Sequence, residues 1–124
     1  MPIEKDLFWK RLESINAGML GTRAQLKLVP MSHYADRDAG ALWFITAQGT
    51  DLVAEVEGGA QPALHIVGDA AGKLWTRMEG HLELSPDRGK LDEIWNRVAA
   101  AWFDEGKDDP DLRLLRLDLS EAEI

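Results

Sequence analysis

The segment best suited to chemistry is the turn at residues 46–51, which carries the hydroxyls of Thr46 and Thr50. It leads from an apolar strand-like run into a short amphipathic segment whose first turn holds Asp51, and Thr50 is placed to cap that helix. Hydroxyls and free backbone N–H groups at a helix start are suited to an anionic group such as a phosphate. An ordinary helix cap uses the same residues, so the pattern indicates either a phosphate site or a cap.

Histidine chemistry is the next possibility, and the chain has three histidines, His33, His65 and His81, and no cysteine. A zinc site would therefore need carboxylate ligands as well. A hairpin turning at residues 70–71 would place His65 near Thr76 and leave His81 beyond the paired end. We therefore expect the histidines not to converge, and we predict no metal site. We expect His33 to lie exposed in a loop. It is the best candidate in the chain for a general acid or base, but we assign no catalytic residue.

Other reactive motifs are missing from the sequence. It contains no G-x-S-x-G nucleophile turn, and the glycines at 18, 21, 58 and 59 match neither a dinucleotide-binding nor a P-loop pattern. The acidic stretch at residues 104–111 lacks the ligand spacing of a helix–loop–helix calcium site, so we interpret it as a solvated loop.

The elements that must position the 46–51 turn follow from hydrophobic periodicity. Residues 42–45 are all apolar, so neither face of that strand is expected to face water. The segment 73–84 alternates cleanly, with Gly80 predicting a bulge, and the alternation at 112–119 slips at Leu114 and Leu115, indicating a bulge or burial on both faces. The expected elements are helices at 4–16, 50–57 and 86–105, strands at 18–22, 26–29, 42–46, 63–67, 73–84 and 112–119, and a hairpin loop at 33–40.

These elements predict a mostly β fold with peripheral helices, arranged as a six-stranded barrel. The 124 residues suffice for one domain spanning 1–124, and residues 120–124 carry no stop signal, which is compatible with a C-terminally shortened chain. The net charge of −8 argues against binding to nucleic acid or to anionic membranes. Without a signal-peptide core or a membrane-length apolar run, we expect a cytoplasmic protein.

With the elements in this order, the chain resembles the FMN-binding split barrels related to pyridoxamine 5′-phosphate oxidase, and in particular their bacterial general stress protein branch. The resemblance covers nearly the whole chain. It rests on the following stretches: Met19-Leu20-Gly21-Thr22, Pro30-Met31-Ser32, Leu42-Trp43-Phe44-Ile45-Thr46, Glu79-Gly80, Trp95, residues 101–111, Leu114-Leu115-Arg116-Leu117 and Glu121-Ala122-Glu123.

The resemblance implies a split β-barrel of FMN-binding type whose flavin nucleotide lies at the interface of a homodimer. Trp75 and Trp102 would reach the flavin from the second subunit. The strand with the Pro-Met pair would run along the isoalloxazine ring, and the strand, turn and helix start that follow would hold the phosphate. The implied ring contacts are Val29, Pro30, Met31 and Ser32, and the implied phosphate contacts are Thr46, Thr50 and Asp51, with Phe44 and Ile45 between them.

Two positions depart from the family pattern. Val29 stands where the family usually has arginine, and Asp51-Leu52 stands where a lysine or arginine usually follows the turn. Both usual residues are cations that would offset a phosphate dianion; Lys27, Arg23 or Arg77 could take their place. The implied function is an FMN-binding general stress protein acting as a flavin-dependent oxidoreductase. The alternative is a split-barrel dimer with a degenerate flavin site that serves as a non-catalytic binding module.

Overall fold

The computed structural model describes residues 5–15, 17–25, 27–69, 71, 74–95 and 106–123. Within these ranges the chain forms seven strands, three α-helices and one short 3₁₀ turn. Their bounds are α1 Lys5–Ser14, β1 Ala17–Thr22, β2 Val29–Ser32, β3 Tyr34–Asp36, β4 Ala41–Ala47, α2 Asp51–Val56, β5 Gln61–Asp69, β6 Leu74–Leu84, α3 Arg88–Ile94, the 3₁₀ turn Gly106–Asp108 and β7 Leu112–Glu123.

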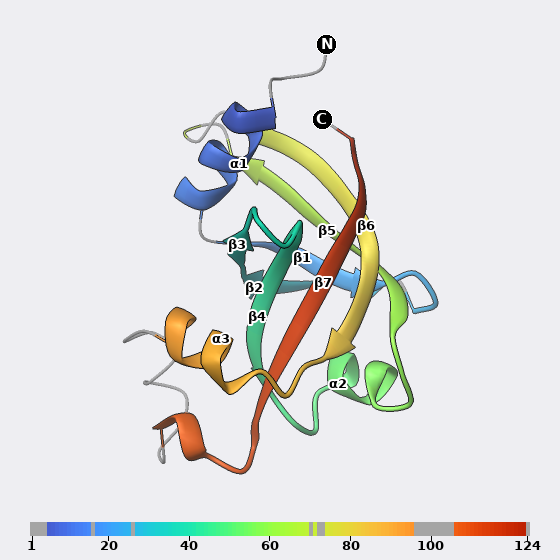
Figure 1. Cartoon of the computed structure of the whole chain (residues 1–124). Coiled ribbons are helices and arrows are strands. Elements are labelled where there is room, and N and C mark those ends of the chain that lie inside the picture. The colour runs from blue at the N-terminus through green and yellow to red at the C-terminus, as the bar shows by residue number, and fades with distance from the viewer. Residues whose placement is uncertain are drawn as a thin grey trace.

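All seven strands belong to one antiparallel sheet with the order β2-β1-β5-β6-β7-β4-β3. The sheet curls strongly, so its concave face encloses the core (Figure 1). Helix α1 packs against β3 and β6, and α2 packs against β6 and β1. The two edge strands, β2 and β3, are joined through the single residue His33. Because β2 and β3 are consecutive in the chain, the two edges of the curled sheet come together at His33.

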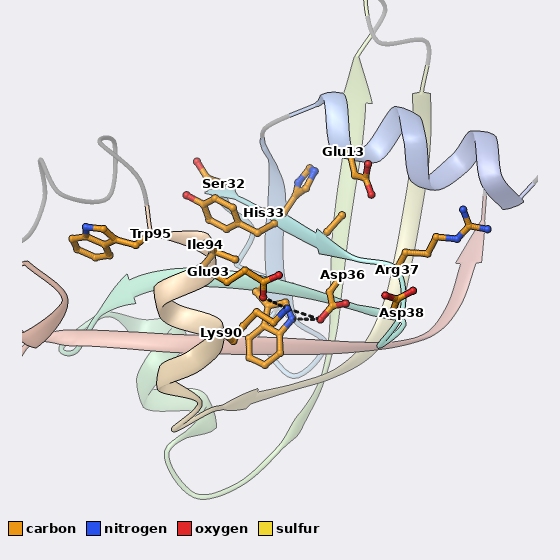
Figure 2. A pocket seen from close by; sticks show the side chains of 13 residues that line it. Glu13, Ser32, His33, Asp36, Arg37, Asp38, Lys90, Glu93, Ile94 and Trp95 are labelled. Carbon is orange, nitrogen blue, oxygen red and sulfur yellow. Dashed lines mark hydrogen bonds and ion pairs between the residues drawn. The ribbon is translucent and has the colours of Figure 1, made fainter.

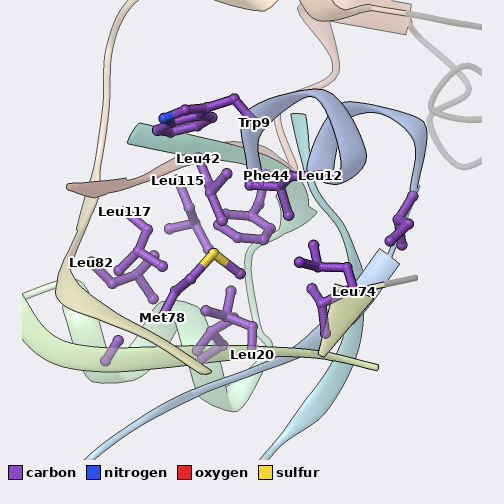
Figure 3. Close-up of a cluster of buried hydrophobic side chains, with 14 of the residues drawn as sticks. Trp9, Leu12, Leu20, Leu42, Phe44, Leu74, Met78, Leu82, Leu115 and Leu117 are labelled. Atoms are coloured by element: carbon purple, nitrogen blue, oxygen red, sulfur yellow. The ribbon is translucent and has the colours of Figure 1, made fainter. Parts of the chain in front are cut away.

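The main core fills the concave face of the sheet (Figure 3). Apolar side chains enter it from both ends, because α1 contributes a stripe on one side and α2 contributes Leu52 and Val56 on the other. This confirms the apolar faces that the sequence predicts for both helices. The largest fully buried members are Leu12, Leu20, Leu42, Phe44, Leu74, Met78, Leu82, Leu115 and Leu117.

A second, smaller core lies on the other side of β4 and β7, under α3. It consists of Trp43, Leu91 and Leu114, and Ile94 packs against it. Strand β7 thus has buried side chains on both faces, since Leu114 enters this second core while Leu115 enters the main one. The slip in alternation at these two leucines is therefore burial on both faces.

Strand β6 has the alternation that its sequence predicts. Its buried side chains point into the barrel and the residues between them point outward. The register between β6 and β7 shifts between Glu79 and Gly80, so the expected bulge at Gly80 is confirmed. A bulge bends its strand and increases its twist, which helps a sheet to curl.

The first half of the sheet differs from the expectation in two ways. The second strand is Val29–Ser32 and not 26–29, because it pairs with β1 so that Met19 lies opposite Pro30. Proline is tolerated there because β2 is an edge strand, where no ladder hydrogen bond from its nitrogen is needed. The expected loop at 33–40 also contains a strand, β3, which raises the strand number from six to seven. Three residues carry too little periodicity to be recognised, and pairing with β4 defines the strand.

Two other boundaries were predicted wrongly. The β5–β6 hairpin pairs His65 with Met78 and not with Thr76, so its centre lies one residue later than expected. Helix α3 begins after Asp87, whose carboxylate accepts from the Lys90 N–H at 2.9 Å, and ends at Ile94. Trp95 has extended backbone geometry, so the predicted helix does not run unbroken to residue 105. The later part of that prediction, residues 96–105 with Trp102, lies outside the described residues.

Candidate functional site

Strand β2 carries the four residues predicted to line a flavin ring, and it lies open along one edge of the sheet. Val29 is 38% exposed, Pro30 and Ser32 are exposed, and Met31 is half-buried against the main core. Four consecutive residues of extended backbone thus present an accessible, largely apolar strand. Such a strand can lie along a flat aromatic ring.

The predicted phosphate turn at 46–51 has the form of a well-made helix cap. The Thr50 hydroxyl accepts from the Val53 N–H at 3.3 Å and donates to the Ala47 carbonyl at 3.1 Å. Gly49 has φ +87°, a left-handed conformation that makes the tight turn possible. Both functions of the Thr50 hydroxyl therefore serve the fold, and the predicted short helix with its cap is confirmed.

We expect Thr50→Ala to lower the free energy of unfolding by about 1 kcal/mol, because the first turn of α2 loses its side-chain acceptor. Thr50→Ser keeps the hydroxyl and serves as the matched control, with an unfolding midpoint close to that of the parent. Urea unfolding followed by tryptophan fluorescence measures both. Equal stabilities of the alanine and serine variants would contradict the role of the hydroxyl in the cap.

Lys27 brings the strand and the turn together. It lies two residues before β2, and its Nζ is 3.5 Å from the Asp51 carboxylate at the start of α2. Both side chains are largely exposed, at 68% and 83%. Of the three cations considered as replacements for the missing family residues, Lys27 lies at the turn, whereas Arg23 pairs with Glu79 at 3.0 Å. The start of β2 and the turn are therefore neighbours, and a lysine stands between them.

The other residues at or near the predicted flavin contacts differ in their exposure to solvent. Phe44 is fully buried and packs edge-to-face on His65, with ring centroids 5.1 Å apart. Ile45 and Thr46 are half-buried toward the end of β4. Leu52 stands where the family usually has a lysine or arginine after the turn. It is buried in the main core, so its side chain points inward and not toward the solvent around the 46–51 turn. Trp75 is 59% exposed on the outer face of β6.

A cleft of about 850 Å³ opens where β2 ends, and it extends from Ser32 along β3 to α3 (Figure 2). Its floor is an ion-paired network in which Lys90 Nζ lies 3.0 Å from Asp36 and 2.6 Å from Glu93. The buried indole of Trp43 donates from Nε1 to the same Asp36 carboxylate at 3.1 Å. This network ties α3 to β3 and β4, and it gives the cleft a charged floor and an aromatic wall, with Tyr34 and Trp95 on its lining.

Asp36 and Lys90 remain charged at neutral pH. Burial acts to raise the pKa of Asp36, but hydrogen bonds from Lys90 and Trp43 outweigh it and lower the pKa below its usual value. The pKa of Lys90 is raised by its hydrogen bond to Glu93, against the effect of burial, and Asp36 adds to the increase. Neither group is poised to exchange a proton near pH 7, so the network acts structurally.

The histidines contradict the expectation most clearly. His33 is only 5% exposed, and its Nδ1 lies 3.0 Å from Nε2 of the fully buried His65. His33 Nε2 lies 3.0 Å from the Leu12 carbonyl of α1. His33 and His65 therefore converge in the core, and His33 is not an exposed loop residue. The inward alternation of residues 63, 65 and 67 was the signal that could have placed His65 inside.

Burial keeps both imidazoles neutral. It lowers the pKa of His33, although the hydrogen bond to the Leu12 carbonyl opposes this shift. Burial and the neighbouring His33 lower the pKa of His65 to about 3, and the nearby Met19 carbonyl offsets this in part. Both nitrogens of His33 are occupied, so this histidine is not available to a substrate as an acid or base.

Within the described residues, no three His, Asp or Glu side chains come together closely enough to hold a metal ion. In the same part of the chain, no helix has the length and apolar character needed to cross a membrane.

The curled sheet with short helices at its ends defines the split-barrel class, and the comparisons agree. A general stress protein 26 candidate from Jannaschia sp. CCS1 superposes with a TM-score of 0.89 at 50% identity, covering 94% of this chain and 76% of that one. The general stress FMN/FAD binding protein of Xanthomonas citri superposes with a TM-score of 0.84 at 32% identity, covering 97% and 88%. The FAD binding protein of Mycobacterium smegmatis shares the fold alone, at 16% identity and a TM-score of 0.61, covering 97% and 93%.

A family profile described as pyridoxamine 5′-phosphate oxidase like matches residues 4–124. The chain belongs to this family, and the resemblance stated from its sequence is confirmed. No curated protein matches the chain.

Proposed function

We propose that this protein is a cytoplasmic general stress protein that binds FMN along β2, with the phosphate beside Lys27 and the 46–51 turn. The observation that carries the proposal is the position of Lys27, whose Nζ lies 3.5 Å from Asp51 where β2 and the turn meet. A lysine at this point supplies the cation that Val29 and Leu52 do not. The 32% identical relative from Xanthomonas citri, named as an FMN/FAD binding protein, supports a flavin ligand.

The chain's own residues suit the two ends of such a ligand. The exposed edge from Val29 to Ser32 offers apolar backbone and side chains to an isoalloxazine ring. At the other end, the Lys27 ammonium would exchange its exposed partner Asp51 for the phosphate, and a charge-assisted bond to a dianion is the stronger interaction. The flavin, when bound, would supply hydride and electron transfer through its ring. We therefore propose a flavin-dependent oxidoreductase.

We also propose that the protein is a homodimer with the flavin at the subunit interface. Met19 and Trp75 are exposed large apolar side chains on the outer face of the sheet, at 37% and 59%, and Val29 adds a third at the β2 edge. Met19 lies opposite Pro30 of β2, so this outer face continues into the proposed ring strand. A second copy covering this face would shield the apolar side chains and enclose the ring.

The proposal predicts that Lys27→Ala weakens FMN binding about tenfold to a hundredfold, because one charge-assisted bond to the phosphate is lost. Riboflavin, which lacks the phosphate, should bind parent and variant equally. The measurement is a flavin-fluorescence titration of ligand-free protein. Lys10→Ala, on the exposed face of α1, is the matched control, and sedimentation of the same samples gives the subunit number.

The outcomes separate this function from the alternative of a degenerate, non-catalytic module. A parent that fails to bind FMN at millimolar concentration contradicts the flavin proposal. If Val29→Arg then restores binding, the site is degenerate, and the missing cation at position 29 is the cause. Equal loss of FMN and riboflavin affinity in Lys27→Ala would place the phosphate elsewhere.

A further inference from the structure

The His33–His65 pair lies at the point where the sheet closes, and its hydrogen bonds fix which nitrogens carry protons. The Leu12 carbonyl can only accept, so His33 Nε2 carries a hydrogen and donates it over 3.0 Å. In a neutral ring, His33 Nδ1 must then accept, and the donor is Nε2–H of His65 at 3.0 Å. His65 Nδ1 is left as a buried lone pair without a partner among the described residues.

This arrangement connects three separate elements through one side chain. The Leu12 carbonyl belongs to the last turn of α1, where it also accepts from the Ile15 N–H at 3.3 Å. His65 lies on β5, in the wall of the barrel, and His33 is the single residue between β2 and β3. The imidazole of His33 therefore anchors the end of β2 to α1 on one side and to the barrel wall on the other.

Strand β2 has few other restraints. It is an edge strand that pairs with β1 over four residues, and three of its four side chains are exposed. Space around the pair is also tight, because a Cβ at Gly18 of β1 would lie 2.7 Å from His65 Nε2. The anchor thus has a defined geometry, whereas the strand that it holds has little packing of its own.

We infer that His33 and His65 are positioning residues that hold β2 in its ligand-binding position, acting through His33 at the end of the strand without touching the ligand. This inference rests on the proposed FMN site. Binding to a strand that is correctly placed only part of the time is weaker in proportion to the competent fraction. The pair therefore sets flavin affinity by keeping that fraction close to one.

The test compares two substitutions at His65 of similar size. His65→Gln keeps an amide N–H able to donate to His33 Nδ1, whereas His65→Leu leaves that acceptor buried and unpaired. We expect FMN to bind His65→Leu about tenfold more weakly than the parent, corresponding to a competent fraction of about a tenth. We expect His65→Gln to stay within about threefold of the parent. His81→Gln, at an exposed histidine of β6, is the control and should bind like the parent.

A second measurement uses the unmodified protein and does not depend on how the variants fold. Nitrogen NMR of the imidazoles should show both buried rings as Nε2–H tautomers, and the same tautomers should persist with saturating FMN because β2 is already held in place. A parent that binds FMN but whose buried rings are not both Nε2–H tautomers, or a folded His65→Leu with parental affinity, overturns the inference but leaves the flavin site intact. A parent that does not bind FMN overturns both.

Discussion

Gly80→Ala is expected to lower the free energy of unfolding by about 3 kcal/mol or more. A Cβ at this position would lie 1.9 Å from the Asp118 carbonyl oxygen and 3.1 Å from the Leu119 Cα on the neighbouring strand. These are backbone atoms of β7, so no side chain can rotate away to make room. The two strands would have to separate at the bulge, which disturbs the ladder that places Leu115 and Leu117 in the main core.

Urea unfolding followed by tryptophan fluorescence measures this effect. Gly58→Ala is the matched control, because a Cβ there meets nothing within 4 Å and the residue lies in an exposed turn. Its stability should stay within about 0.5 kcal/mol of the parent. If Gly80→Ala unfolds at the parental urea concentration, β7 can move at no cost, and the close contact at the bulge does not constrain the sheet.

Acid should destabilise the protein through His65, starting below pH 6.5. In the unfolded chain the imidazole titrates near 6.5, whereas in the folded protein its pKa is about 3. Between these pH values the unfolded state binds a proton that the folded state does not bind. The free energy of unfolding therefore falls as the pH decreases from 6.5 toward 3. The slope is about 1.4 kcal/mol per pH unit, so the contribution at pH 4.5 is a loss of about 2.7 kcal/mol. Above pH 6.5 this histidine gives no pH dependence.

The pH dependence can be isolated by comparing the parent with His65→Gln at pH 7.5 and pH 4.5. Carboxylates titrate in both proteins and cancel in the difference, so the variant should lose about 2.7 kcal/mol less than the parent over this interval. His81→Gln should follow the parent, because its histidine is exposed on β6. Parallel stability curves for the parent and His65→Gln would show that the buried imidazole accepts a proton in the folded state.

Several parts of the protein could be predicted from local sequence because local physics determines them. The alternation in β6 follows from the period of two of a strand, and Gly80 marks the bulge because any side chain would meet the next backbone. Thr50 as the cap of α2 follows from the chemistry of helix starts. The family and its fold follow from the motifs, since they occur in the right order along the chain.

The tertiary structure decided the features that depend on how the chain bends. Strand β3 exists because its three residues pair with β4, and the position of β2 depends on β1. The pair of His33 and His65 joins residues 32 positions apart, and a hairpin centre one residue later changes the partner that each β5 residue has on β6.

The candidate site shows the same division between local and long-range information. By itself the sequence determined the family resemblance, and through it the two segments that we propose meet a flavin, the Pro-Met strand and the capped turn. Only the tertiary structure placed Lys27 at Asp51 and brought His33 against His65 in the core. The physical reason is that caps and periodicity act over a few residues, whereas contacts between distant segments depend on strand register, which a shift of a single residue alters.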